Sequence, residues 1–176
     1  MTTTKYMMSA GLAFSEQSDL RKLRKKAAKG WIVKHFKFAG YELEKGPAED
    51  VIFSIDYRDL KEEDSQEYFE IFEMSGWNHV CSDAGMHLFR ALPDTKPIYS
   101  DKESTIDKHV RLGKPIFPIA FICTLVTIIS YLLSQVDSNV MRSSFEMLFL
   151  ISIVITTPAL MTLGAVLFHM WKEKRL

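Results

Sequence analysis

The sequence predicts an α+β domain followed by a stalk helix and a hairpin of two transmembrane helices. The α+β domain is expected because Gly-Trp and Ala-Gly pairs recur in the same order between residues 5 and 90, each time among helical and strand-like patterns. The hairpin is expected because residues 115–133 contain no Asp, Glu, Lys, Arg or His, and residues 147–171 form a second apolar run. A short polar bridge separates these two runs.

The first unit of the domain shows a strand, a helix and two further strands. Ser15 supplies a capping hydroxyl, and Glu16 and Asp19 place acids near the positive end of the helix dipole. Gly30 is expected to end the helix in a left-handed conformation. The predicted elements are a strand over 5–9, a helix over 15–29, a strand over 31–38, an Ala39-Gly40 turn and a strand over 41–45.

The second unit repeats this order. Its elements are a strand over 51–58, a helix over 65–75, a strand over 78–82, an Ala84-Gly85 turn and a strand over 86–90. The two units are predicted to pair into one antiparallel sheet with both helices on one face. Trp31 and Trp77 follow the helices at equivalent positions, where core packing is favoured over stacking on a ligand.

The remaining chain is expected to lead into the membrane. Ser100 and Glu103 have the spacing of a capping box for a stalk helix over 101–112, and Gly113, Pro115 and Pro118 are expected to bend or restart it. The predicted divisions are a cytoplasmic duplicated domain 1–92, a linker and stalk 93–113, a first span 114–134, an extracytoplasmic loop 135–145, a second span 146–171 and a cytoplasmic tail 172–176. Small residues are expected to line the contact between the spans: Ala120, Thr124, Thr156, Ala159 and Gly164.

The distribution of basic residues and the cysteine content indicate the cellular compartment. Basic residues flank both outer ends of the hairpin (Lys108, Arg111 and Lys114; Lys172, Lys174 and Arg175), whereas the bridge holds only Arg142. Both termini are therefore expected in the cytoplasm of a multi-pass protein of the cell membrane. No signal-peptide pattern precedes the domain, and the two cysteines, Cys81 and Cys123, are too far apart in sequence to predict a disulfide framework.

The first predicted helix is basic, and the second is acidic. Two solvated faces that attract each other as neighbours or across a dimer are the simpler interpretation. The alternative is that the basic helix contacts anionic lipid headgroups. Nucleic acid is not expected as a partner, because no binding module accompanies these charges. The candidate membrane-surface residues are Arg21, Lys22, Arg24, Lys25, Lys26 and Lys29.

Catalytic signatures are missing from the sequence, which shows no GxSxG, P-loop, GxGxxG or HExxH pattern. His79 and Cys81 are two apart on a predicted strand and therefore expected on one face, with His87 on the return strand near them. This arrangement is the closest to a metal site, but it lacks a CxxC or HxxxH signature. We therefore expect no enzyme, no cofactor and no metal.

The segments LRKLRKKAAKGW, GYELEKG, IDYRDL, EYFEIFEMSGW and IYSDKESTIDKH resemble a Gram-positive bacterial family known only as a domain of unknown function. The resemblance covers residues 14–111. It implies a cytoplasmic module ahead of membrane spans and a genetic neighbourhood with PadR-like regulators. It implies no catalytic residues.

The duplicated strand-helix-strand-strand order also resembles the GyrI-like small-molecule-binding fold, with a ferredoxin-like arrangement as the related description. This likeness implies a cleft between the units that accepts small apolar ligands. The aromatic residues near the unit boundary are then the candidate lining: Trp31, Tyr41, Phe53, Tyr57 and Trp77.

These observations favour a non-enzymatic, membrane-tethered sensor or regulatory adaptor. Its cytoplasmic domain is expected to bind a small molecule or a protein partner, and the partner can be another membrane protein. The hairpin is expected to hold the protein in the lipid bilayer. The alternatives are an accessory subunit of a membrane transporter and, less favoured, a metal-dependent enzyme that uses His79, Cys81 and His87.

Overall fold

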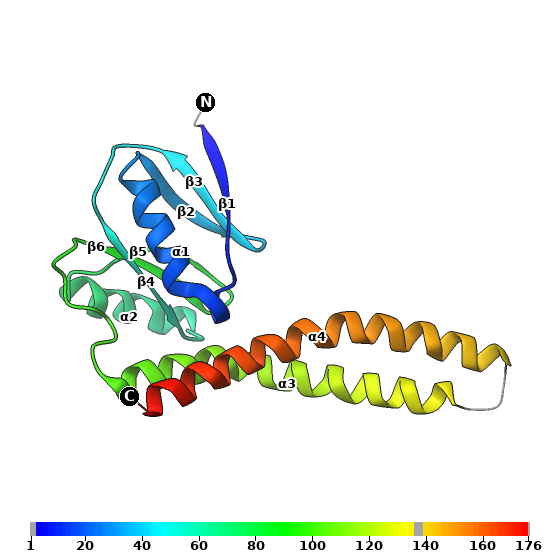
Figure 1. The fold of residues 1–176 in the computed structure, drawn as a ribbon. Coiled ribbons are helices and arrows are strands. Elements are labelled where there is room, and N and C mark those ends of the chain that lie inside the picture. The colour runs from blue at the N-terminus through cyan, green and yellow to red at the C-terminus, as the bar shows by residue number, and fades with distance from the viewer. Residues whose placement is uncertain (1–2, 136–138, 176) are drawn as a thin grey trace. The chain divides into compact units, whose positions relative to one another are not determined.

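The computed structural model describes residues 3–135 and 139–175, and it divides after Lys108 into two units. The predicted α+β class is confirmed, since the first unit contains two three-stranded antiparallel sheets and two helices (Figure 1). Its elements are β1 (Thr4–Met8), α1 (Leu12–Ala27), β2 (Trp31–Lys37), β3 (Gly40–Lys45), β4 (Ile52–Tyr57), α2 (Glu62–Met74), β5 (Asn78–Asp83) and β6 (Met86–Ala91).

The two halves of this unit, β1 to β3 and β4 to β6, have the same order of elements. Their sheets also have equivalent strand orders, β1-β3-β2 and β4-β6-β5, so the last strand of each half lies in the middle. Gly30 and Gly76 both follow their helices with positive φ values of 73° and 85°. The predicted Ala84-Gly85 turn is confirmed, and both of its residues have positive φ. The first turn lies one residue earlier than predicted, at Phe38 and Ala39, and Gly40 is the first residue of β3. Ala39 and Ala84 both adopt the left-handed conformation, but Ala39 is the second residue of its turn and Ala84 the first.

The single sheet predicted from the sequence is wrong, because the halves form two separate sheets. The sheets approach each other through β2 and β5, which lie side by side without a common ladder. Both strands carry a register shift at the same place, between Val33 and His35 in β2 and between His79 and Cys81 in β5. A bulge twists a strand and disrupts its regular hydrogen bonding. This explains why β2 and β5 do not form a common hydrogen-bonded ladder.

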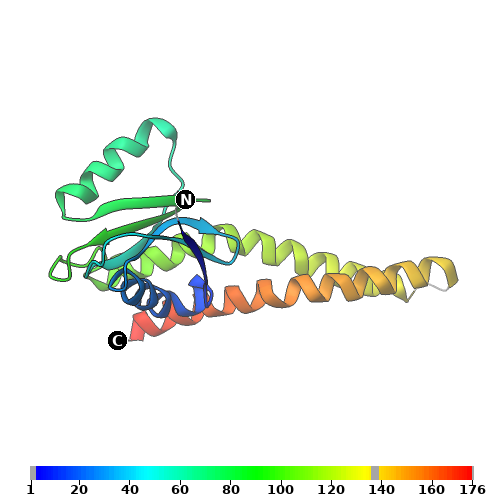
Figure 2. The same ribbon diagram turned by 90° about the horizontal axis from the view of Figure 1, so that it is seen from above.

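The helices do not share one face, as the sequence had predicted. Figures 1 and 2 show α1 and α2 on opposite sides of the strands. The reason lies in β4, which is buried on both faces: its Tyr57 hydroxyl donates to Glu16 of α1, and its Asp56 accepts from Tyr68 of α2. An apolar run without strict alternation is typical of such a doubly covered strand.

The helix starts differ from the sequence prediction. α1 begins at Leu12, before the expected cap, but Ser15 has non-helical dihedrals (φ −150°, ψ 34°) and interrupts the first turn. α2 begins three residues earlier than expected, at Glu62. The long third helix, α3 (Lys102–Ser134), is capped by Asp101 rather than Ser100, because the Ser104 amide donates to Asp101 Oδ1 at 2.8 Å.

The second unit consists of most of α3 and of α4 (Asn139–Arg175), so α4 begins inside the range expected to be a loop. α3 continues through Pro115 and Pro118, which overturns the expected break at these residues. The two helices run antiparallel. Thr127 and Thr156 hydroxyls meet at 2.8 Å, and Ala120 and Val166 are buried.

Among the small residues expected at this contact, Ala120 and Thr156 are buried, Thr124 and Ala159 are partly buried, and Gly164 is exposed with open space around it. Gly113, rather than Gly164, is the glycine that packs closely between the two helices, because an added Cβ at Gly113 would lie 3.1 Å from Val166 Cγ1.

Candidate functional site

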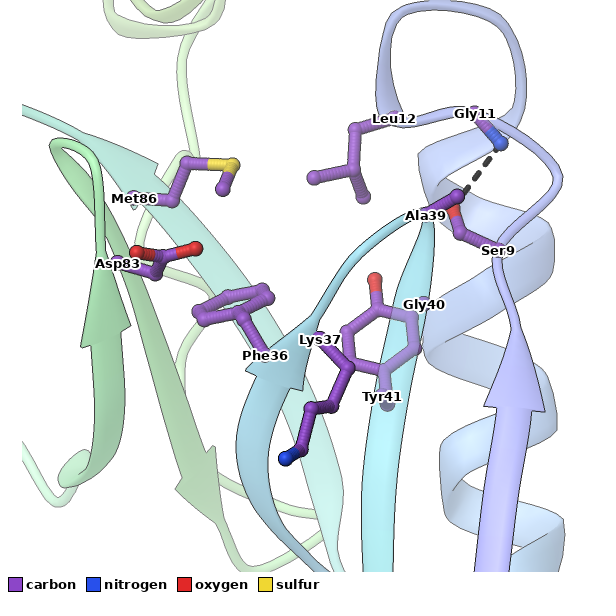
Figure 3. Close-up of a pocket in the computed structure, with 10 residues that line it drawn as sticks. All are labelled: Ser9, Gly11, Leu12, Phe36, Lys37, Ala39, Gly40, Tyr41, Asp83 and Met86. Carbon is purple, nitrogen blue, oxygen red and sulfur yellow. Dashed lines mark hydrogen bonds between the residues drawn. The ribbon is translucent and has the colours of Figure 1, made fainter.

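A pocket of about 310 Å³ lies where the two halves of the first unit meet (Figure 3). We call it the junction pocket. It is built from the loop after β1, the β2–β3 hairpin and the end of the β5–β6 hairpin. Its lining consists of Ser9, Gly11, Leu12, Phe36, Lys37, Ala39, Gly40, Tyr41, Asp83 and Met86.

The hairpin turns explain why these residues come together. Lys37 and Gly40 flank the Phe38-Ala39 turn directly, as Asp83 and Met86 flank the Ala84-Gly85 turn. Because β2 and β5 lie side by side, the turn ends of both hairpins reach the same region. Residues at equivalent positions of the two halves therefore face one pocket.

Tyr41 is the polar group buried most deeply in the junction pocket, with 1% of its surface exposed. Its ring contacts Phe36, with ring centres 5.6 Å apart. Within the part of the chain that the structure describes, its hydroxyl has no hydrogen-bond partner. The nearby Ser9 hydroxyl donates to Asp19 and accepts from the Gly11 amide at 3.0 Å.

The surroundings of Tyr41 keep its phenol protonated. Burial raises the pKa of Tyr41, and the negative charges of Asp19 and Glu16 raise it further. The proximity of the Ser9 hydroxyl lowers it by a smaller amount. The Tyr41 hydroxyl is thus a donor without an acceptor, which is costly in a buried position.

A second polar group, the carboxylate–tyrosine cluster, joins both halves to the start of α3. It consists of Glu16, Asp56, Tyr57, Tyr68, Tyr99 and Lys108. Lys108 is buried and pairs with Glu16, which also accepts from the Tyr57 hydroxyl at 3.0 Å.

Asp56 is the other acid of this cluster. It accepts from the Tyr68 and Tyr99 hydroxyls and from the Tyr57 amide. The Lys108 ammonium lies 4.8 Å from the centre of the Tyr99 ring, so Tyr99 connects the two carboxylates. Both acids therefore make structural contacts that join separate elements of the domain.

The structure separates the five aromatic residues that the sequence proposed for a ligand site. Tyr41 lines the junction pocket, whereas the other four lie elsewhere in the first unit. Trp77 is buried, packs with Tyr68 and Phe89, and donates from Nε1 to the Lys96 carbonyl at 2.9 Å. Trp31 is partly exposed, with the Lys5 and Lys45 ammonium groups within 5.5 Å of its ring centre.

The remaining two candidates lie on β4, where Phe53 and Tyr57 are buried. Ligand binding by these residues stays a prediction. The sequence reasoning missed Leu12, Phe36 and Met86, which form apolar walls of the pocket. The duplicated hairpin was the available signal, because pocket residues flank its turn in both halves.

The bulge in β5 overturns the expected one-face arrangement of His79 and Cys81. His79 is paired with Phe89 and Cys81 with Leu88, so the register shift between them sends the two side chains to opposite faces. Ser82 Oγ lies 2.7 Å from both His79 Nε2 and His87 Nδ1. Within the described residues, no group of three His, Cys, Asp or Glu is placed to hold a metal ion.

Burial is the main cause of the pKa shifts of Cys81 and His79, the two residues beside this bulge. It raises the pKa of Cys81 to about 11, with the Asp83 charge adding to the rise and the Phe36 backbone opposing it. Burial also lowers the pKa of His79, as does the neighbouring His87. Both shifts favour the uncharged form, so the Cys81 thiol is not activated as a nucleophile at neutral pH, and the His79 imidazole is neutral.

The six basic candidate residues, five on α1 and Lys29 just after it, are largely solvent-facing, and two of them are already paired. Lys22 binds Asp19 at 3.0 Å, and Arg24 makes a two-pronged contact with Asp50 at 2.8 and 3.0 Å. Arg21, Lys25 and Lys29 are exposed, and Lys26 is partly exposed. No ion pair joins α1 to the acidic α2 among the residues that the structure describes. Contact with anionic lipids stays a prediction.

Comparison with known proteins places the chain in a family. No curated protein and no solved structure matches it. The family model described as "Protein of unknown function (DUF2812)" matches residues 15–121. The match runs from α1 into α3 and includes both hairpins, the junction pocket from Phe36 onward and the carboxylate–tyrosine cluster. Since it covers more than half of the sequence, the chain belongs to the DUF2812 family.

Proposed function

We propose that the protein is a non-enzymatic, membrane-tethered sensor. In this proposal the first unit binds a small molecule in the junction pocket, α3 and α4 anchor the protein in the bilayer, and the bound state is passed to a partner protein. The single observation that carries the proposal is the junction pocket itself, with its apolar walls and the unpartnered Tyr41 hydroxyl.

Membrane anchoring is supported by the two long helices. Lys102–Ser134 and Ser143–Arg175 are long and apolar enough to cross a membrane, and only 11% and 17% of their most apolar windows are buried. A core helix of a soluble protein would be mostly buried instead. Lys172, Lys174 and Arg175 lie in the last turn of α4, which supports our proposal that both termini face the cytoplasm.

Signal transfer is supported by the short path between the pocket and α3. Leu12 lines the junction pocket, and Glu16 lies in the next turn of the same helix. Ser15 interrupts the helix between them, which gives this turn freedom to adjust. Glu16 holds Lys108 of α3, so a ligand that shifts the first turn of α1 also acts on this ion pair.

The common plan of the two halves supports an internal repeat, in which equivalent hairpin ends form a shared ligand site. The equal strand orders, bulge positions and left-handed turn residues all favour this interpretation. A site between repeats is also sensitive to small changes in their relative position, as a sensor requires.

The test combines fractionation with ligand binding to the full chain. After lysis and a carbonate wash, we expect the protein in the membrane fraction. In detergent micelles, neutral compounds of about ten heavy atoms should raise the melting temperature. Met86→Trp, which fills the pocket, should abolish this rise, whereas Met8→Trp on an exposed position of β1 should leave it unchanged.

Hydrogen exchange then tests whether binding is sensed. A stabilising compound should slow amide exchange in the first turns of α3, and Lys108→Met should remove this effect while binding persists. Recovery of the protein in the soluble fraction would refute the tether. If a compound binds but amide exchange in α3 does not change, the protein binds a ligand without transmitting a signal, and the sensor proposal is refuted.

A further inference from the structure

The junction pocket also indicates the chemistry of its ligand. The strongest indication is Tyr41, whose hydroxyl is buried and has no partner among the described residues. A buried hydroxyl without a partner is rare in folded proteins because its desolvation is not compensated. Figure 3 shows the Tyr41 hydroxyl pointing toward Leu12, inside the ring of pocket residues.

The polar groups next to Tyr41 are already committed, so they do not compete for the ligand. Ser9 donates to Asp19, and the same carboxylate accepts from the Ala10 amide at 3.0 Å and from Lys22 at 3.0 Å. Lys37 at the pocket lies 3.6 Å from Glu42. The Tyr41 hydroxyl is therefore the group best placed to recognise a polar atom deep in the pocket.

Electrostatics decides which polar atom fits. Asp19 and Glu16 raise the pKa of Tyr41 together with burial, so the phenol keeps its proton and presents a donor. An anion is disfavoured beside it, because the apolar walls and one neutral donor would not compensate the loss of its hydration. The complementary atom is thus a neutral acceptor, such as a carbonyl oxygen.

The size and walls of the pocket restrict the rest of the ligand. Its volume of about 310 Å³ is near the lower end for ligand sites, which suits a compact molecule. Leu12, Phe36 and Met86 supply an aliphatic chain, an aromatic ring and a thioether. These groups favour an apolar body, and Phe36 favours an aromatic one.

We propose that the junction pocket binds a compact, neutral molecule that has an apolar body and one carbonyl-type oxygen, with Tyr41 Oη donating a hydrogen bond to that oxygen. The apolar body packs among Leu12, Phe36 and Met86. This inference rests on the proposed function, because it specifies the ligand class of the same pocket.

The test uses two probes of nearly equal shape, acetophenone and α-methylstyrene, which differ by a C=O group in place of a C=CH₂ group. Affinities for the full chain in micelles are measured by ligand titration in NMR spectra. Wild-type protein should bind acetophenone roughly fivefold to tenfold more tightly than α-methylstyrene, the range expected for one net hydrogen bond. In Tyr41→Phe the ratio should fall to about one, through loss of acetophenone affinity alone.

Tyr41→Phe is a suitable variant because it removes an unpartnered hydroxyl and keeps the ring that packs on Phe36. Its melting temperature should equal or exceed that of wild type, which reports that the variant is folded. Met86→Trp should block both probes, which locates them in the junction pocket.

Two results would overturn the inference. Equal affinities of wild type for both probes would mean that the hydroxyl holds only solvent, and an unchanged ratio in Tyr41→Phe would assign the oxygen to another donor. Neither result affects the proposed function, which requires only that some compound binds the pocket. A failure of all compounds to stabilise the protein would remove the proposed function and this inference together.

Discussion

The two halves of the first unit share a backbone plan but bury different side chains. In both, a glycine with positive φ follows the helix, the next residue is a tryptophan at or just before the start of a strand, a bulge follows, and the turn contains an alanine with positive φ. The helices differ in their packing. α1 buries Leu20, Leu23 and Ala27 and packs against β2 and also against β4 of the other half, whereas α2 buries only Tyr68 and packs against β5.

The tryptophans show the same difference. Trp31 lies partly exposed beside two lysines, and Trp77 is 3% exposed in an aromatic cluster with Phe72 and Phe89. The connector after β6 causes this asymmetry, because Ile98 covers the cluster and the Lys96 carbonyl accepts from Trp77. Backbone geometry is thus determined by a few local residues, whereas burial is determined by what packs on each half.

The largest expected effect tests this difference directly. Trp77→Ala should lower the free energy of unfolding by about 3–5 kcal/mol, because it leaves a cavity among Tyr68 and Phe89. The equivalent Trp31→Ala should cost less than about 1 kcal/mol, since it removes mainly contacts with lysine ammonium groups at the surface. Urea denaturation of the full chain in micelles, followed by amide exchange in β3 and β6, measures both. Similar costs would show that the halves are energetically equivalent.

The next effect concerns the ion pair that joins the first half to α3. Lys108→Met should destabilise the first unit by about 3 kcal/mol, because it leaves the largely buried Glu16 side chain, which is 12% exposed, without its cation. Lys102→Met on an exposed position of the same helix is the matched control and should have little effect. Adding Glu16→Gln to Lys108→Met should recover part of the loss. If the Lys102 and Lys108 variants unfold alike, the pair is not what connects α3 to the domain.

A smaller effect depends on pH and on Cys81, which lies just after the bulge of β5, where the equivalent residue of β2 is the exposed His35. Folding raises the pKa of Cys81 from 9.0 to about 11. Between these values the unfolded chain releases the thiol proton first, so the stability contributed by Cys81 should fall as the pH rises from 9 to 11. The difference in melting temperature between wild type and Cys81→Ala should therefore change steadily over this range.

The same burial should make Cys81 slow to react with iodoacetamide at pH 8, as read by mass spectrometry of the peptide that contains it. Denaturation should restore the reaction. Rapid labelling of the native protein would mean that the bulge opens readily, and it would weaken the contrast between the β2 and β5 edges.

The sequence predicted those parts of the fold that single residues control. Gly30, Gly76 and the Ala84-Gly85 pair marked helix ends and a turn, because few residues tolerate positive φ. The Ala39-Gly40 pair placed the first turn one residue too late, since Gly40 belongs to β3. The apolar runs predicted the long helices, because the length and composition of such a run can also be read locally from the sequence. The order of helices and strands followed from these local sequence signals alone.

The remaining features depend on tertiary contacts, which the sequence pattern does not contain. The bulges of β2 and β5 change the face of every later side chain, and this reversed the predicted geometry of His79 and Cys81. The side on which α1 packs depends on β4, a strand from the other half. The junction pocket was missed because the prediction followed the tryptophans, whereas the pocket forms at the hairpin turns.

The smallest expected effect tests the left-handed alanine that each half has in its hairpin turn. Ala39 and Ala84 are exposed and have φ values of 52° and 46°, a conformation that strains an L-residue. Ala39→Gly and Ala84→Gly should each raise the free energy of unfolding by about 0.5 kcal/mol, because relief of strain outweighs the entropy gained by the unfolded chain. The measurement is the urea midpoint of each variant.

Gly40→Ala provides the opposite control, since its Cβ would lie 2.3 Å from the Met7 carbonyl oxygen and 2.6 Å from the Tyr6 hydroxyl. The backbone must move to admit it, at a cost of about 1–3 kcal/mol. Equal gains from the two alanine variants would show that both turns carry the same strain although their surroundings differ. A gain in one half and a loss in the other would show that the common backbone plan does not extend to the energies of its turns.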